Sequence, residues 1–354
     1  MNGFFFDARF IKVDRPDGIS RFALGLLREL RSQLDVTVMV SSKEQQELIG
    51  GSSFVMLPEV TSPKEIFTAF KLNRLGAKVV FSPMQTTSGL GRRFKLILTL
   101  HDLIYYRHRT PPREFNPAIR FAWFLFHLSY LPQRIILNSS DAVVTVSKTS
   151  KSEIERVKLT KRPISVVYNA SDLGEGKPTN QASSNYVVYM GSFIGYKNVE
   201  TLIRAVALSG LELVLLSKIT PAREQKLRLL ASNFGSKVRF IGGVSDREYV
   251  EFLQGARALV SASKDEGFGI PVVEAMGQGI PVVISDIEIF REIAEEAGSY
   301  FAPQDEHSLA AHLSALGDPA TWAKFSRLGL SRSTAFSWTK SASELATLVR
   351  SLST

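Results

Sequence analysis

Short apolar runs recur along both halves of the chain, and each run is followed by a turn and a stretch with helical spacing. Alternation of β-type runs with helical stretches is typical of parallel sheets that helices cover on both faces. The sequence therefore predicts an α/β protein whose functional residues lie at the carboxyl ends of its strands. The predicted strands are 36–40, 78–82, 95–100, 142–146 and 164–168 in the first half, and 186–190, 211–216, 237–241, 258–261 and 281–284 in the second.

A polar stretch at residues 171–184 separates the two halves and contains few apolar residues. Such a composition between periodic segments is typical of a loop or linker. The chain, at 354 residues, is also longer than one hydrophobic core usually supports. We therefore expect two domains, one over residues 1–172 and one over residues 185–336, joined by this linker.

Gly18 lies at a predicted turn into a helix. The apolar positions that follow it, from Ile19 to Leu30, have the spacing of one helical face. Glycine at such a turn lets the backbone bend sharply or approach another group closely. The turn is therefore a candidate binding element of the first domain.

The stretch from Glu266 to Glu274 combines a glycine loop with the start of a helix. Pro271 suits a first helical position, where its missing N–H costs nothing. The N–H groups and positive dipole end of such a helix suit a phosphate, whereas two carboxylates suit sugar hydroxyls. The loop lacks the third glycine of a dinucleotide fingerprint, so the glycines alone indicate little.

The whole string Glu266-Gly-Phe-Gly-Ile-Pro-Val-Val-Glu274, with Ala275-Met-Gly-Gln-Gly-Ile-Pro-Val-Val283 after it, resembles the Glu-x7-Glu signature of retaining glycosyltransferases of family 4. The resemblance implies the GT-B fold, with two facing Rossmann-like domains, parallel sheets and a central cleft. It also implies an acceptor-binding first domain, a donor-binding second domain, and a terminal helix, about 337–354, that packs back on the first domain. The implied activity is metal-independent transfer of a hexose, with retention, from a nucleoside diphosphate sugar to a hydroxyl of a glycan or lipid-linked acceptor.

The resemblance also implies roles for individual residues. Glu266 is expected to hold sugar hydroxyls near the reacting carbon, and Glu274 the ribose hydroxyls. His101, directly after a predicted strand, matches a family histidine that lies over the reacting carbon. His101 and Glu266, together with Lys197, are therefore the expected catalytic residues, while Gly18 matches a loop beside the donor phosphates. The donor loop comprises Gly267, Phe268, Gly269 and Ile270.

The turn that begins at Gly191 resembles the family's diphosphate-binding turn. Lys197 matches the family's lysine, and lysine binds phosphate as a point charge. Ser192 stands where the family commonly has an arginine, so either its hydroxyl and the loop N–H groups suffice or a basic residue elsewhere substitutes. In a later turn, the backbone around Val244 is expected to meet the nucleobase.

Charge is unevenly distributed along the chain, which carries a net charge of +9. Residues 1–178 hold 26 Lys and Arg against 16 Asp and Glu, whereas the remaining residues hold 17 against 18. A basic half suits anionic lipid, an anionic acceptor or nucleic acid, and charge alone does not choose among them.

Aromatic residues cluster among arginines between residues 111 and 136. At helical spacing such residues are more often core than interface. Nearby Arg113, Arg120 and Arg134, with the basic turn at 91–95, favour a surface that sits on anionic lipid. We therefore expect the first domain to dock peripherally on the inner membrane face and reach a lipid-linked acceptor. The aromatic residues are Phe115, Phe121, Trp123, Phe124, Phe126 and Tyr130.

Composition narrows the other choices. The chain has no cysteine, which excludes disulfides and thiolate metal sites and fits the cytoplasm. No apolar run approaches the roughly 20 residues of a membrane span, and the start of the chain lacks signal-peptide features. The five histidines are scattered, so no zinc spacing is present and no metal site is expected.

We expect no cofactor besides the donor substrate, and the resemblance favours GDP-mannose over UDP-sugars. Two other classes stay open. One is a catalytically weak nucleotide-sugar-binding partner subunit, which the serine at position 192 permits. The other is a basic nucleic-acid-binding protein, although no recognised nucleic-acid motif is present, so we do not expect this partner.

Overall fold

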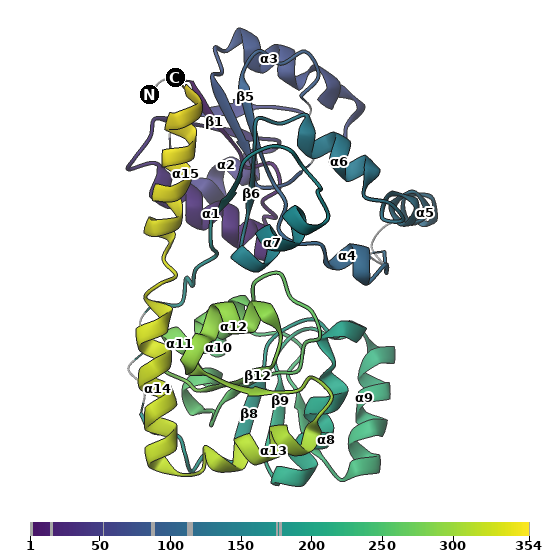
Figure 1. The fold of residues 1–354 in the computed structure, drawn as a ribbon, viewed down its shortest axis with the longest axis vertical. Coiled ribbons are helices and arrows are strands. Elements are labelled where there is room, and N and C mark those ends of the chain that lie inside the picture. The colour runs from purple at the N-terminus through teal and green to yellow at the C-terminus, as the bar shows by residue number, and fades with distance from the viewer. Residues whose placement is uncertain are drawn as a thin grey trace. The chain divides into compact units, whose positions relative to one another are not determined.

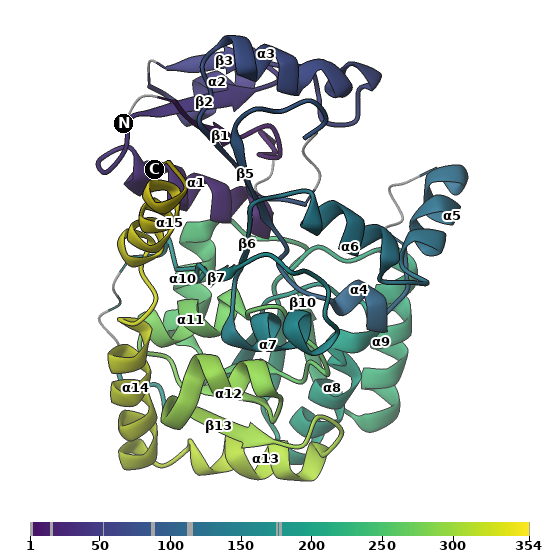
Figure 2. The same ribbon diagram turned by 45° about the horizontal axis from the view of Figure 1, so that its top comes forward.

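The computed structural model describes residues 3–14, 17–51, 53–85, 89–111, 116–174, 176 and 179–353. The chain folds into two compact units, called here the first unit (Met1–Ala170 with Ser337–Thr354) and the second unit (Ser171–Phe336). Each unit has one parallel sheet flanked by helices (Figures 1 and 2). The α/β class predicted from the alternating pattern is therefore confirmed.

The first unit has a seven-stranded parallel sheet in its described residues. Its strands are β1 (Phe4–Asp7), β2 (Val36–Val40), β3 (Phe54–Met56), β4 (Val79–Ser82), β5 (Lys95–Thr99), β6 (Ala142–Thr145) and β7 (Ile164–Val166). Their order is β3-β2-β1-β4-β5-β6-β7, so the direction in which strands are added reverses between β1 and β4. Its helices are α1 (Gly18–Leu30), α2 (Lys43–Ile49), the 3₁₀ helix Pro63–Phe67, α3 (Thr68–Arg74), α4 (Ile104–Arg107), α5 (Pro117–Phe126), α6 (Leu131–Asn138), α7 (Lys148–Arg156) and α15 (Trp338–Ser353).

The sheet of the second unit has six parallel strands among the described residues. They are β8 (Tyr186–Tyr189), β9 (Glu212–Leu215), β10 (Lys237–Phe240), β11 (Leu259–Ser261), β12 (Val282–Ser285) and β13 (Gly298–Phe301). Their order is β10-β9-β8-β11-β12-β13, which reverses between β8 and β11. The helices are the 3₁₀ helix Gly195–Lys197, α8 (Val199–Ser209), α9 (Pro221–Phe234), α10 (Asp246–Gly255), α11 (Ile270–Gly277), α12 (Glu288–Ala294), the 3₁₀ helix Glu295–Ala297, α13 (Glu306–Ala315) and α14 (Pro319–Ser333).

Three strands, β1, β3 and β13, are absent from the sequence prediction. They have only three or four residues each, and β13 includes Gly298 and Ser299, which have low strand propensity. Tertiary pairing compensates for this, because β1 is a fully buried strand between β2 and β4. No helix in the described part of the chain has both the length and the hydrophobicity of a membrane span.

Helix α15 packs on α1 in the first unit. The ring of Trp338 lies over Gly25, where an added Cβ would stand 2.2 Å from Trp338 Cε2. Glycine at this position therefore allows the two helices to approach closely. Two hydrogen bonds extend the contact: Ser341 Oγ donates to the carbonyl of Tyr168 (2.7 Å), and Thr339 Oγ1 donates to Glu29 Oε2 (2.9 Å).

The segment expected to be a linker is held at the C-terminal end of α11. Gln278 Nε2 donates to the carbonyl of Gly174 (3.0 Å), and the amide of Gly176 donates to the carbonyl of Gly277 (3.0 Å). A Cβ at Gly176 would stand 2.5 Å from the Cα of Gln278. This part of the segment is therefore fixed to α11 by one side-chain and one backbone hydrogen bond.

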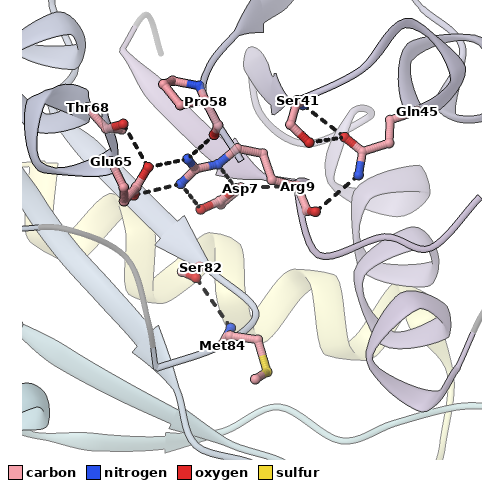
Figure 3. A network of polar contacts seen from close by, with 9 residues as sticks. All are labelled: Asp7, Arg9, Ser41, Gln45, Pro58, Glu65, Thr68, Ser82 and Met84. Atoms are coloured by element: carbon pink, nitrogen blue, oxygen red, sulfur yellow. Dashed lines mark hydrogen bonds and ion pairs between the residues drawn. The ribbon is translucent and has the colours of Figure 1, made fainter. Parts of the chain in front are cut away.

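A buried ion network follows β1 in the first unit (Figure 3). Arg9 lies between two carboxylates, with its Nη2 2.8 Å from Asp7 Oδ2 and its Nη1 2.6 Å from Glu65 Oε2. Its Nη1 also donates to the carbonyl of Pro58 (2.9 Å), and Thr68 Oγ1 donates to Glu65 Oε2 (2.8 Å). Burial alone would lower the pKa of Arg9, but the two carboxylates outweigh it and raise the pKa, so the guanidinium stays charged.

Candidate active site

The main candidate site lies where strand order reverses in the sheet of the second unit. The loop from Gly191 to Asn198 follows β8, and the loop from Ala262 to Gly269 follows the neighbouring strand β11. In open parallel sheets, ligands bind beyond the carboxyl ends of the strands at such a reversal. Both loops were singled out from the sequence, and the topology brings them together.

Backbone and side-chain bonds join these two loops. The amide of Lys264 donates to the carbonyl of Tyr196 (2.8 Å), and Asn198 Nδ2 donates to the carbonyl of Ala262 (3.1 Å). Asn198 has a φ of 53°, in the left-handed region that asparagine tolerates better than most residues. Asn198 therefore both bends the chain into α8 and fixes the distance between the loops, a role that sequence reasoning missed.

Lys197 and Glu266 form an ion pair across the two loops. Lys197 Nζ donates to Glu266 Oε1, which also accepts a hydrogen bond from Ser263 Oγ (2.9 Å). The two side chains are 15% and 13% exposed, so the pair lies at the surface of the site but is largely desolvated. Within the described residues, Glu266 Oε2 accepts no hydrogen bond and Lys197 Nζ donates no second one, so both retain capacity for a ligand.

The N-terminus of α11 faces the same loop. The helix begins at Ile270, so Pro271 is its second residue rather than its first, and no side chain caps this end. Gly269 has a φ of 93°, and a Cβ there would stand 2.8 Å from Phe290, so glycine is required on both counts. Pro271 has no N–H, and the amide of Val272 donates to the carbonyl of Gly269 (2.9 Å), so the helix dipole and the amide of Ile270 are what this end offers to an anion.

The remaining residues of the signature support the loop or lie below it. Gly267 is buried, and Phe268 is 4% exposed and packs edge-on against Phe336 at 5.6 Å. Glu274 lies one turn into α11 and is also 4% exposed. Of the two signature carboxylates, Glu266 is thus the one that is partly exposed, whereas a ligand would have to reach inward to meet Glu274.

Ser192 lies in a tightly bonded part of the β8 loop. The amide of Gly191 donates to Ser217 Oγ (3.0 Å), and the hydroxyl of Tyr189 donates to the carbonyl of Ser192 (2.6 Å). Burial raises the pKa of Tyr189 well above its ordinary value, so the hydroxyl keeps the proton that it donates. The loop is therefore held by Tyr189 at the end of β8 and by Ser217, which follows β9.

Arg223, on α9, brings a cation to this loop. Its Nε donates to the carbonyl of Phe193 (2.9 Å), and its Nη1 lies 2.8 Å from Glu200 Oε1. Its buried Nη2 has no hydrogen-bond partner among the described residues. A guanidinium paired with Glu200 thus binds the residue after Ser192, and no sequence motif had indicated Arg223 for this place.

Val244 lies apart from the Lys197–Glu266 pair. It follows β10, which is separated from β8 by β9. The turn before it contains Gly242 and Gly243, with φ values of 81° and 117°, and the amide of Gly243 donates to the carbonyl of Leu216 (2.9 Å). Among the described residues no hydrogen bond links Val244 to the pair.

His101 lies in the first unit, at the carboxyl end of β5. Its Nε2 donates to the carbonyl of Pro83 (2.9 Å), so this nitrogen carries the ring proton and Nδ1 is the acceptor. The ring meets Phe22 of α1 edge-on at 5.1 Å. Burial lowers the pKa of His101 more than the Pro83 hydrogen bond raises it, so the imidazole is neutral at pH 7.

Gly18 is the first residue of α1, directly after the N-cap residue Asp17. Asp17 Oδ1 accepts hydrogen bonds from the amide and the hydroxyl of Ser20 (both 2.9 Å), and its Oδ2 lies 2.8 Å from Lys12 Nζ. Burial alone would raise the pKa of Asp17, but Lys12 and Ser20 outweigh it and lower the pKa. The Gly18 turn is therefore capped, and its helix contacts His101 within the same unit.

Three or more His, Asp or Glu side chains do not gather as metal ligands anywhere in the described ranges. Two residues quoted from the aromatic segment, Arg113 and Phe115, lie outside the described residues.

Comparison with solved structures identifies the fold. Sucrose-phosphate synthase from Thermosynechococcus elongatus matches with a TM-score of 0.78 and 21% identity, covering 99% of both chains. HepE from Anabaena, solved with UDP-glucose, matches with a TM-score of 0.74 and 17% identity, again covering 99% of both chains. The two parallel-sheet units therefore have the GT-B fold of glycosyltransferases.

Family comparisons identify the family. Residues 16–175 match the model of Glycosyltransferase Family 4, and residues 175–321 match that of Glycosyl transferases group 1. The O-antigen chain mannosyltransferase RfbU of Salmonella typhimurium is 27% identical over 307 residues, which cover 82% of this chain and 84% of RfbU. The chain belongs to the group 1 glycosyltransferases, and the resemblance stated from its signature is confirmed.

Proposed function

We propose that this glycosyltransferase moves mannose, with retention and without a metal, from GDP-mannose to a hydroxyl of a glycan or lipid-linked acceptor. The observation that carries the proposal is the Lys197–Glu266 pair at the strand-order reversal, beside the open N-terminus of α11. The pair offers hydrogen-bond donors and an acceptor side by side. A sugar phosphate presents the complementary groups, a phosphate oxygen and neighbouring hydroxyls.

In the proposed complex, Lys197 and the N-terminus of α11 bind the diphosphate. Glu266 Oε2 accepts a hydrogen bond from a sugar hydroxyl, while Ser263 keeps the carboxylate oriented through Oε1. Glu274 receives the ribose, and the turn at Val244 receives the base. Arg223, next to Ser192, supplies the second positive charge that the serine itself lacks.

In the proposed reaction, the bond between the sugar's anomeric carbon and the diphosphate oxygen breaks, and its electron pair stays on that oxygen. Lys197 and the helix dipole stabilise this charge, as preorganised donors do. The acceptor hydroxyl then bonds to the anomeric carbon on the same face, and its proton passes to the departing phosphate. No protein nucleophile is needed. His101 of the first unit is neutral, with Nδ1 as an acceptor.

The choice of mannose rests on RfbU, whose name describes an O-antigen chain mannosyltransferase. HepE, solved with UDP-glucose, supports a nucleoside diphosphate sugar in general but a different base and sugar. A thermal-shift panel separates the two, because a ligand that binds only the folded state raises its apparent stability. We expect GDP and GDP-mannose to raise the melting temperature more than UDP and UDP-glucose; the reverse order would overturn the donor assignment.

Matched carboxylate variants test the site. Glu266→Gln is expected to lower kcat by about 10²–10³-fold, because it removes a contact made at the reacting sugar. Glu274→Ala is expected to weaken GDP binding about tenfold or more, the effect of losing a hydrogen bond to a charged group. Glu251→Gln, on the exposed face of α10, is the control. Equal and small effects at Glu266 and Glu274 would contradict the assignment.

The chemistry has its own readouts. The anomeric configuration of the product, measured by NMR, is expected to match that of the donor, and activity is expected to survive chelation of divalent metal. Donor that stays intact after long incubation with lipid and glycan acceptors would instead favour a catalytically weak binding subunit.

We also propose peripheral association with the inner, anionic face of a membrane through the basic first half. The excess of 26 basic over 16 acidic residues in positions 1–178 supports this. Such a location brings the site to a lipid-linked acceptor.

A further inference from the structure

Helix α5 is apolar on its outward face and has no buried residue. Helices of globular proteins normally bury one apolar face against their own core. Figures 1 and 2 both show α5 standing away from the sheet of its own unit. Packing within the first unit therefore does not account for the apolar side chains of this helix.

Three large apolar side chains of α5 and one in the turn after it follow one helical stripe. Phe121, Phe124 and Leu125 of α5, with Leu128 of the turn, have the spacing i, i+3, i+4, i+7, and they are 64%, 39%, 48% and 46% exposed. We call these four residues the α5 stripe. Contiguous apolar side chains of this size on a surface mark an interaction site.

The opposite face of α5 is held by aromatic contacts, which fix the direction of the stripe. Trp123 stacks on His127 with ring centroids 3.9 Å apart and meets Tyr105 edge-on at 5.0 Å. His127 is buried and packs on Tyr106 at 5.0 Å. Because Trp123 lies nearly opposite Phe121 around the helix, these contacts leave the stripe turned outward.

The stripe continues onto the next helix and lies among positive charges. In α6, Leu131 and Ile135 are one turn apart and are 57% and 64% exposed. The described residues between 103 and 140 include four arginines and no Asp or Glu. Arg107 is paired with Glu153 of α7 (2.6 Å), so the positive charge near the stripe comes from Arg109, Arg120 and Arg134. Exposed Arg120 lies beside Phe121 in α5 itself.

We propose that the α5 stripe, with Leu131 and Ile135 of α6, lies in the headgroup layer of an anionic bilayer. Apolar side chains flanked by arginines, without acidic residues, are what an interfacial helix on anionic lipid requires. A second copy of the chain fits less well, because a two-fold interface would set the same arginines against each other. The inference takes its partner from the membrane association proposed above and adds the element that makes the contact.

Liposome flotation of the full chain tests this. With vesicles that contain phosphatidylglycerol, we expect binding that persists in part at about 1 M salt, where charge attraction is screened, because the stripe is apolar. Phe121→Ser/Leu125→Ser is expected to lower the partition coefficient at least about tenfold. The matched control is Phe67→Ser/Leu229→Ser, whose side chains are 62% and 64% exposed elsewhere, and it is expected to bind as the unaltered chain does.

A fluorescent label gives a readout that keeps the stripe intact. The chain has no cysteine, so Ala122→Cys places a single polarity-sensitive dye on the exposed side of α5. We expect its emission to shift to the blue with anionic vesicles, whereas a dye at Ala311→Cys on α13 stays unchanged. This variant decides the question if Phe121→Ser/Leu125→Ser lowers the melting temperature.

The results that would overturn the membrane inference differ from those that would overturn the proposed activity. No flotation with anionic vesicles, equal flotation of the stripe variant and its control, or an unshifted Ala122→Cys dye would each overturn the inference. So would a dimer in sedimentation that the stripe variant abolishes, since it would assign the stripe to a second copy. The melting-temperature shift with GDP is expected to be equal in the unaltered chain and in Phe121→Ser/Leu125→Ser, so donor binding is scored separately.

Discussion

Replacement of Arg9 by methionine removes the only cation of the Asp7–Arg9–Glu65 network as drawn in Figure 3. The side chains of Arg9 and Asp7 are fully buried, and that of Glu65 is 11% exposed. Methionine fills much of the same volume, so the loss is mainly electrostatic. The buried carboxylates of Asp7 and Glu65 then lose the guanidinium that lies between them, which costs about 3–5 kcal/mol of unfolding free energy.

The structure also predicts an order of effects within the network. Glu65→Gln leaves the neutral pair of Arg9 and Asp7, with its hydrogen bonds at 2.8 Å, so we expect a loss of only about 1–2 kcal/mol. In Arg9→Met/Glu65→Gln, one of the two buried carboxylate charges is gone. The double variant should therefore be more stable than Arg9→Met alone. If the two effects simply added, the double variant would instead be the less stable of the two.

Urea denaturation followed by circular dichroism measures these free energies. Hydrogen exchange resolved by mass spectrometry assigns the change to the first unit, because a chain of two units need not unfold in one step. Arg247→Met, at a solvent-exposed ion pair on α10, is the control and is expected to leave the transition unchanged.

The reasoning would be refuted if Arg9→Met lost less than Glu65→Gln, or if Arg9→Met and Arg247→Met unfolded alike. Either result would mean that water or rearrangement compensates the buried carboxylates.

Three further predictions concern packing and the site. Gly25→Ala should lower the stability of the α15 contact by about 1–3 kcal/mol, because the added Cβ meets Trp338. Gly277→Ala, where the nearest atom to the added Cβ is 3.9 Å away, should not. Hydrogen exchange of the α15 amides in the two variants checks this. Arg223→Gln should weaken GDP binding in calorimetry more than Arg247→Gln does. The pKa of His101 is lowered by burial, so the ring stays neutral as the pH falls to about 6.5, and kcat should hold constant there; a fall that His101→Asn abolishes would contradict a neutral role.

Much of the fold could be predicted because the strands are buried on both faces and appear as apolar runs. The predicted strand at 36–40 has the same bounds as β2, and the predicted strand at 142–146 is one residue longer than β6. Strand β1 has only four residues, of which one is the charged Asp7, so its composition hides a central strand. Its assignment depends on pairing with β2 and β4, which no local pattern records.

The candidate site was predictable as separate motifs but not as a set of contacts. Lys197 and Glu266 are 69 residues apart, and their pairing depends on β8 lying beside β11. Ser263, which orients Glu266, and Arg223, beside Ser192, have no spacing that marks them. Helical periodicity likewise indicated the apolar residues of α5 without indicating whether anything covers them.

The Lys197–Glu266 pair has a consequence for turnover. Without a ligand, the lysine charge is already neutralised by the carboxylate, so a phosphate alone must compete with that carboxylate for it. In the complex proposed above, a sugar nucleotide avoids the conflict, because its hydroxyls bind the carboxylate while its phosphate binds the lysine. Once the sugar has been transferred, the nucleotide left behind would face an unsatisfied negative charge. On this proposal, the same two residues that bind the full donor favour release of the product nucleotide.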